Sequence, residues 1–247
     1  MPLYSAQVII LRRRDFQETD KVVTAYTREF GKLSAIAKGA RRSTSRLVGA
    51  TEPLVYARMQ LATGRNFDII SEAVIKHAFS GLRSTRQRIG QGMYLAELTD
   101  ALVDERQSSP ELFDLLLSSL YLLEGRIADA ATILRFQMQA LDIAGYSPEV
   151  NRCAHCQAVR PAGRPAAFSP SLGGIVCNRC LQFEDIPKSP AQVLDAMQQL
   201  CTLPASGIQS FSLAPEDLGL LRRLVSAHIR FHIERDLKTE ALLTQPG

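Results

Sequence analysis

The fold of the N-terminal third is decided by Val22-Val23-Thr24-Ala25-Tyr26-Thr27, the turn Gly31-Lys32, and Leu33-Ser34-Ala35-Ile36-Ala37. The first segment is rich in β-branched and aromatic residues, which favour strands. The last segment partly alternates apolar and small residues, as a strand with one covered face does. The stretch therefore predicts two consecutive strands joined by a short turn.

More strands are predicted on both sides of this pair. Gln7–Leu11 precedes it, Leu54–Leu61 follows it, and the turn Thr63–Asn66 leads to Phe67–Ile70. Five short strands joined by polar turns fit a small closed barrel, and the OB-fold is the common architecture of that size. We expect an OB-fold domain over residues 1–80, with a basic loop or short helix over Lys38–Arg46.

The pattern becomes helical after Ser80-Gly81. Apolar residues then recur at helical spacing, and Ser109-Pro110-Glu111 has the composition of a helix start. The expected helices lie at about 93–102, 109–124, 127–141, 190–201 and 215–238. The predicted class is thus α+β and multidomain: the barrel is followed by an all-α domain over residues 81–247, which a cysteine segment at about 151–183 interrupts.

Four of the five cysteines form two C-x-x-C pairs, separated by twenty residues; they are Cys153, Cys156, Cys177 and Cys180. Such paired knuckles suit one tetrahedral Zn²⁺, with Zn–S distances of ~2.3 Å. Four thiolates leave no open coordination position, so the expected zinc is structural. His155 is a substitute ligand that four cysteines make unnecessary, and chance spacing is the bland alternative. Cys201 falls on an apolar stripe and is expected in the core.

Positive charge is concentrated in the N-terminal third. Residues 1–80 hold 13 Lys and Arg against 7 Asp and Glu, whereas the rest holds 16 against 18. This asymmetry suggests an acidic polymer as partner, and a solvated surface is the alternative. No apolar run approaches the ~18 residues of a membrane helix. The apolar start also lacks the charge order of a signal peptide, so we expect a cytoplasmic protein without membrane contact.

Residues 32–46 form the richest basic stretch, with five cations and no acid. Its hydroxyl side chains and Gly39 suit contact with a phosphate backbone. Arg12, Arg13 and Arg14 could line the same barrel face. The interleaved aromatics are expected mostly in the core, with some able to stack bases; they are Tyr26, Phe30, Tyr56 and Phe67.

A search for catalytic motifs finds none. The chain lacks the Gly-rich phosphate loop and the nucleophile elbow of common enzymes. His228 and His232 have the i, i+4 spacing of metal ligands but no third partner, so a packed pair is the favoured interpretation. We therefore predict a protein that is not an enzyme.

The N-terminal blocks resemble the RecO family of bacterial recombination mediators. Arg12–Thr24 is similar to the opening block of that family, and Thr27–Leu33 with Ala37–Ser43 is similar to the next block. The cysteine quartet after a helical segment matches the zinc-bearing members. The resemblance extends in order over essentially the whole chain.

The resemblance implies a particular function and set of partners. It implies binding of single- and double-stranded DNA and annealing of complementary strands. It also implies action with RecR, and with RecF, to load RecA onto DNA covered by single-stranded DNA-binding protein (SSB), whose acidic C-terminal tail is one contact. Such a protein would act at the nucleoid.

The resemblance also ranks the basic residues for DNA contact. Lys38, Arg41, Arg42 and Arg46 match the family's basic segment and are the first candidates. The second candidates are Lys32, Arg12, Arg13 and Arg14. The alternative from another class is a zinc-ribbon scaffold for proteins, whose basic barrel binds RNA or an acidic partner.

Overall fold

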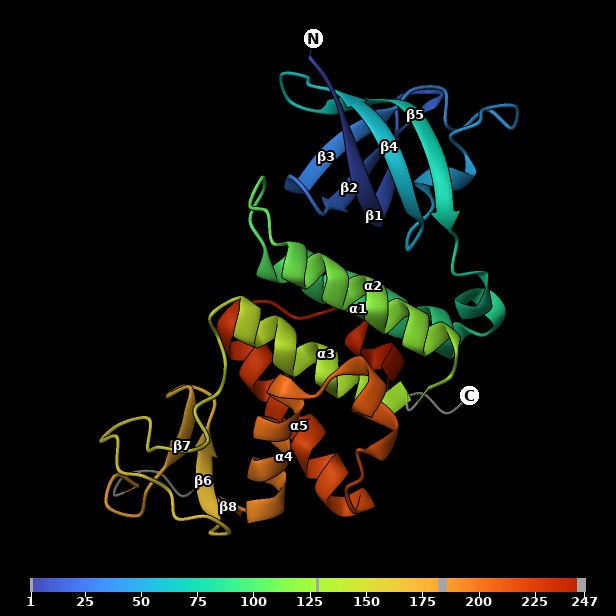
Figure 1. Cartoon of the computed structure of the whole chain (residues 1–247). Helices are drawn as coiled ribbons and strands as arrows, with labels where there is room; N and C mark the ends of the chain where they lie inside the picture. The colour runs from blue at the N-terminus through green and yellow to red at the C-terminus, as the bar shows by residue number, and fades with distance from the viewer. Residues whose placement is uncertain (1, 128, 182–185, 244–247) are drawn as a thin grey trace. The chain divides into compact units, whose positions relative to one another are not determined.

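The computed structural model describes residues 2–127, 129–181 and 186–243 (Figure 1). The chain forms two compact units. The first comprises Met1–Arg126 with Leu237–Gly247, and the second comprises Ile127–Asp236. Among the described residues, no helix combines the length and apolar character needed to cross a membrane.

The first unit begins with a closed five-stranded barrel (Figure 1). Its strands are β1 (Leu3–Phe16), β2 (Asp20–Thr27), β3 (Gly31–Ala37), β4 (Tyr56–Ala62) and β5 (Asp68–His77). Their order around the barrel is β1-β2-β3-β5-β4, with β3 and β5 parallel and the other pairs antiparallel. This is the strand order of the OB-fold, so the predicted barrel is confirmed.

The barrel core follows from the alternation of the strands. Val8, Val23, Leu33, Met59 and Ile70 point into the closed interior and are almost fully buried. In β2, every residue from Lys21 to Thr27 is buried, because the second face of this strand is also covered. The phenol of Tyr26 donates a hydrogen bond to the Ser109 carbonyl, which lies at the start of a helix. A strand covered on both faces explains why its sequence reads as one apolar run.

Two α-helices complete the first unit, together with the short 3-10 helices η1 (Gly49–Thr51), η2 (Ser80–Ser84) and η4 (Glu240–Leu243). Helix α1 (Arg86–Leu102) starts earlier than predicted because the Thr85 hydroxyl caps it by accepting from the Arg88 N–H. Helix α2 (Pro110–Glu124) has the predicted start, with a Ser109 cap and proline in its first turn. Both helices belong to the same compact unit as the barrel. The boundary between the compact units follows Arg126, whereas the predicted boundary between a barrel domain and a helical domain follows residue 80.

The loop between α1 and α2 packs closely on the barrel. Gly31 has φ of +70°, and a side chain there would meet the Gln107 carbonyl oxygen at 2.0 Å. The Arg106 N–H donates to the Lys32 carbonyl at 2.8 Å. Two features therefore require glycine at position 31: its left-handed backbone conformation and the close approach of the α1–α2 loop.

The second unit combines three helices with a small sheet (Figure 1). The helices are α3 (Asp129–Ile143), α4 (Ala191–Thr202) and α5 (Pro215–Ile233), and α5 ends before the predicted residue 238. The sheet has the order β7-β6-β8 and consists of β6 (Ala166–Ser169), β7 (Gly174–Val176) and β8 (Lys188–Ser189). The predicted helical region with a cysteine insertion is confirmed. Its expected end at about residue 183 lies outside the described residues.

Candidate functional site

The basic segment after β3 is a chain of tight turns rather than a helix. We call residues 38–46 the basic loop. Its backbone N–H groups are tied locally: Arg42 donates to the Gly39 carbonyl at 3.0 Å, and Ser45 to the Arg42 carbonyl at 2.9 Å. The Arg41 N–H crosses to the Thr19 carbonyl at 2.8 Å. The loop therefore has a defined path although it lacks secondary structure.

Asp20 anchors the basic loop from the first residue of β2. Its carboxylate accepts the Gly39 N–H at 2.8 Å and the Thr19 hydroxyl at 3.0 Å. The bond from Gly39 is the main reason that the pKa of Asp20 is lowered, and the charges of Lys38 and Arg42 contribute. Gly39 has φ of +66°, a left-handed conformation that glycine adopts without strain.

The four first candidates for DNA contact are all exposed on this loop. Arg41 lies 3.6 Å from Asp15 and donates to the Gln17 carbonyl at 3.0 Å. Lys38, Arg42 and Arg46 have no carboxylate within 4.0 Å among the residues that the structure describes. Three cations thus remain available to an outside anion, and the structure brings them together on one loop.

The second candidates are largely neutralised within the protein. Arg12 and Lys32 both reach Asp100 of α1, at 3.1 and 3.2 Å. The Lys32 side chain is only 14% exposed and also donates to the Asp100 carbonyl at 2.7 Å. Arg13 pairs with Glu52 at 3.1 Å. These contacts join the barrel to its neighbouring helix and loop, which leaves less charge for a phosphate.

Arg14 differs from its neighbours in the arginine run. Its guanidinium carbon lies 6.0 Å from the centroid of the Phe16 ring, within the range of a cation–π contact. Within the described ranges it has no carboxylate within 4.0 Å. Arg14 is therefore the member of the second group that stays available for an anion.

An ion pair between the buried Asp68 and the exposed Arg106, absent from the sequence predictions, fixes the α1–α2 loop to the barrel. Asp68 has a side chain of 0% exposure and accepts from the Arg106 guanidinium at 2.7 Å. Tyr4 donates its phenol to the same carboxylate. Burial and this hydrogen bond raise the pKa of Tyr4 to about 12. The cluster is structural, and no local sequence signal identifies it because its members are 38 and 64 positions apart.

The second candidate site is the cysteine cluster. The Sγ atoms of Cys153, Cys156, Cys177 and Cys180 all lie within 4.8 Å of one another. The Cys156 and Cys177 sulfurs are 3.6 Å apart. A tetrahedral zinc with Zn–S distances of ~2.3 Å needs sulfur separations of about 3.8 Å. The arrangement therefore fits a four-coordinate metal ion with only small adjustments.

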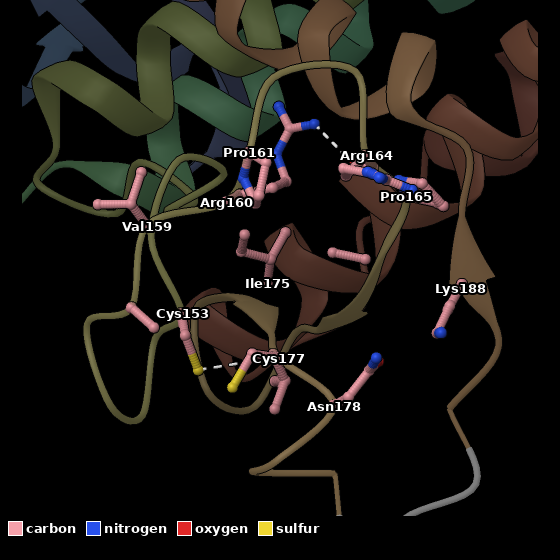
Figure 2. A pocket seen from close by; sticks show the side chains of 13 residues that line it. Cys153, Val159, Arg160, Pro161, Arg164, Pro165, Ile175, Cys177, Asn178 and Lys188 are labelled. Carbon is pink, nitrogen blue, oxygen red and sulfur yellow. Dashed lines mark hydrogen bonds between the residues drawn. The ribbon is translucent and has the colours of Figure 1, made fainter.

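Backbone N–H groups around the cluster favour thiolates. The Cys177 N–H points at the Cys153 sulfur, with an N···S distance of 3.4 Å (Figure 2). Burial raises the pKa of Cys153, but N–H groups of Cys156, Cys177 and His155 outweigh it and lower the pKa to about 6. The neighbouring Cys156 sulfur is the main cause that raises the pKa of Cys180 to about 12. A divalent cation would offset this repulsion among four sulfurs.

The four arginines of the cysteine segment differ in exposure and in their contacts. Arg160 is a structural residue: its side chain is 6% exposed, bonds the Val150 carbonyl at 2.8 Å, and pairs with Asp195. Arg152, Arg164 and Arg179 are exposed. Arg164 borders a hollow of about 370 Å³ beside the cluster, and most of the other lining residues are apolar (Figure 2). Arg160 thus contributes to the fold of the segment, whereas the other three arginines are exposed.

The two histidines of α5 form a packed pair. Their ring centroids are 4.4 Å apart, and the His228 Nε2 lies 2.7 Å from the Tyr146 carbonyl, to which it donates. Burial lowers the pKa of both rings, so they are neutral at pH 7. Among the described residues, the cysteines are the one group of three or more side chains placed to share a metal.

Comparisons with known proteins match both parts of the chain. A family model described as the N terminal of recombination protein O matches residues 1–79, and one described as its C terminal matches residues 83–241. The DNA repair protein RecO of Pelotomaculum thermopropionicum is 38% identical over 249 residues, covering 100% of this chain and 96% of the relative. The protein of the same name from Symbiobacterium thermophilum is 35% identical, covering 98% and 97%.

Proposed function

The chain belongs to the RecO family of DNA repair proteins, and from this premise we propose that it anneals complementary single strands during recombinational repair. The observation that supports the basic loop as the DNA contact is its exposed and unpaired charge at Lys38, Arg42 and Arg46. Arg41 adds a partly neutralised charge on the same loop, and Arg14 adds a cation outside the loop on the same unit. Lys32, Arg12 and Arg13 contribute less because they are paired internally.

Annealing by this surface needs charge but no chemical step. Lys and Arg side chains neutralise phosphates and release condensed counterions, which drives binding of either strand. Two strands held on one basic surface repel each other less, so short complementary stretches pair and then extend. This mechanism requires neither nucleotide hydrolysis nor a nucleophile, in line with the RecO family as DNA repair mediators that generally lack catalytic activity.

The cysteine cluster is proposed to hold one structural Zn²⁺. The ligands would be Cys153, Cys156, Cys177 and Cys180, whose sulfurs already cluster. A four-thiolate shell is closed to substrate, so the ion would supply folding energy to a segment that contains only short strands. The zinc is therefore assigned to stability rather than to DNA pairing.

The proposed partners follow from the family. We infer that the protein works with RecR, and with RecF, at single-stranded DNA covered by SSB. Contact with the acidic SSB tail would bring it to coated strands, and RecA loading would follow. This work would take place at the nucleoid.

The experiment that tests the function is annealing of complementary oligonucleotides, bare and coated with SSB, over a salt series. We expect annealing without nucleotide, which slows as salt rises. The same assay with RNA strands tests the scaffold alternative. A protein that binds RNA but fails to pair DNA at low salt would contradict the proposal.

A further inference from the structure

Two phenylalanines meet between the β1–β2 and β4–β5 turns. Phe16 is the last residue of β1, and Phe67 directly precedes β5. Their ring centroids are 6.1 Å apart and the rings are inclined by 58°. Both side chains are only half-buried, whereas Phe79 and Phe113 of the same unit are fully enclosed. The pair therefore presents ring surface to solvent at one end of the barrel.

One arginine lies against this pair, and a second is in the same turn as Phe67. The Arg14 guanidinium lies 6.0 Å from the Phe16 ring centroid. Arg65 is exposed in the β4–β5 turn and, in the part of the chain that the structure describes, has no carboxylate within 4.0 Å. Rings beside unpaired arginines suit a ligand that is both flat and anionic, which is the chemistry of a nucleotide.

The pair adjoins the basic loop. Arg41 donates its side chain to the Gln17 carbonyl at 3.0 Å and its backbone N–H to the Thr19 carbonyl at 2.8 Å. Gln17 follows Phe16 directly, so the loop and the rings share the β1–β2 turn. In OB-folds, the turns between strands 1 and 2 and between strands 4 and 5 are regular places for oligonucleotides.

We propose that Phe16 and Phe67 form a stacking subsite for unpaired bases of single-stranded nucleic acid. The inference rests on the proposed function, because the phosphates of the same strand would lie on the basic loop. Every base has a π-face, so stacking on the rings is independent of sequence. Bases within a duplex are already stacked on one another and cannot reach the rings. The subsite therefore adds affinity for single strands alone.

The subsite also bears on pairing. Glu18 is exposed in the β1–β2 turn, and its negative charge disfavours a phosphate there. The phosphates of a bound strand would therefore lie on the basic loop, and its bases would lie at the rings. A strand held by its phosphates, with few bases on the protein, keeps its other bases free for a complement. As the complement pairs, the stacked bases leave the rings and the duplex is released more easily.

The absence of tryptophan from the chain gives a direct test. In the full-length variant Phe67→Trp the new residue is the single tryptophan, and stacking with thymine bases should quench its emission. We expect saturating oligo-dT to quench this emission strongly, because stacking places a base directly against the indole ring. The matched control is Phe231→Trp. Phe231 is 49% exposed on α5 and belongs to the other compact unit, outside the proposed subsite, so its emission should change much less.

Affinities complete the test. Phe67→Leu keeps apolar volume but removes the ring, and should weaken binding of oligo-dT by about 5- to 20-fold. The affinity for duplex DNA, and the slope of log affinity against log salt, should remain those of the parent. Phe67→Tyr, which keeps a ring, should bind oligo-dT as the parent does. Parent-like binding of oligo-dT by a folded Phe67→Leu variant would overturn the subsite. If that variant does not fold, unquenched emission of Phe67→Trp at saturating oligo-dT would overturn it. A parent protein that binds no DNA would instead overturn the proposed function as well.

Discussion

The basic loop and the cysteine segment are both irregular, yet different forces hold them. The loop is ordered by hydrogen bonds from its own backbone and from Asp20, and three of its four cations, Lys38, Arg42 and Arg46, have no carboxylate within 4.0 Å among the described residues. The cysteine segment is gathered around four sulfurs, and its best-ordered arginine, Arg160, is used internally. Under the proposed function, the specific cysteine motif stabilises the fold, whereas the less specific basic run contacts DNA.

Metal removal should break one region and spare the other, and it is the largest expected effect. With zinc bound, a chelator or Cys156→Ser should lower the free energy of unfolding of the Ile127–Asp236 unit by on the order of 5 kcal/mol. Urea unfolding followed by circular dichroism measures this change. Cys201→Ser is the control, since Cys201 lies outside the cluster. A metal-free protein of parental stability would contradict the brace.

Removing the loop charges should have the converse effect. Alanine at Lys38, Arg41, Arg42 and Arg46 removes up to four phosphate contacts, so DNA affinity at ~0.2 M salt should fall by roughly 100-fold. Annealing should slow in proportion, while thermal unfolding stays close to that of the parent because three of the four have no ionic partner. Fluorescence anisotropy and an annealing time course provide the two readouts. Parental annealing by the folded variant would refute the assignment.

Loosening the basic loop without removing its cations separates the effect of the loop's backbone path on DNA binding from the effect of its charge. Asp20→Ala deletes the acceptor of the Gly39 N–H and makes the surface more positive by one charge. Charge alone predicts tighter DNA binding. We expect about 3- to 10-fold weaker binding instead, because the cations lose their shared arrangement at a cost of about 1 kcal/mol or more. Affinity for single-stranded DNA is the measurement, and tighter binding would show that the path of the loop is unimportant.

The smallest effect concerns the segment after α3, where the His228 ring donates a hydrogen bond to the Tyr146 carbonyl. Burial lowers the pKa of His228 below its ordinary 6.5. Just below pH 6.5 the unfolded chain therefore binds a proton at this residue more readily than the folded chain does. The stability of the second unit is therefore complete above pH 6.5 and decreases as pH falls below it. Between pH 7 and 5.5 we expect the free energy of unfolding to decrease because of this group. Urea unfolding of the parent and of His228→Phe at both pH values tests this, since the variant should lose less.

Local patterns made much of the fold predictable. Strand alternation, the Gly31 turn and the Ser109-Pro110 helix start are all encoded by neighbouring residues, and the structure has each of them. The cysteine spacing was equally readable, because two C-x-x-C pairs need little besides a loop to bring them together. The prediction ended β1 at Leu11, whereas the strand continues to Phe16. Its polar second half pairs with β2 and gives no apolar signal of its own.

The state of the charges was not predictable from the sequence. Lys32 is a cation in a basic run, yet Asp100, 68 positions away, neutralises it. The exposed Arg106 pairs with the buried Asp68 in the same way, since only the fold brings the α1–α2 loop to β5. Which cations remain available to an anion is a property of tertiary pairing, and it separates Lys38, Arg42 and Arg46 from Lys32, Arg12 and Arg13.

The salt dependence of single-stranded DNA binding tests this separation most directly. Two triple-alanine variants with the same loss of charge should be compared with the parent: Lys38/Arg42/Arg46, which are unpaired, and Arg12/Arg13/Lys32, which are paired. We predict that the first variant lowers the slope of log affinity against log salt by ~2 to 2.7, or ~0.7 to 0.9 for each contact, and that the second lowers it by less than about one. Equal slopes for the two variants, or the reverse order, would contradict the account.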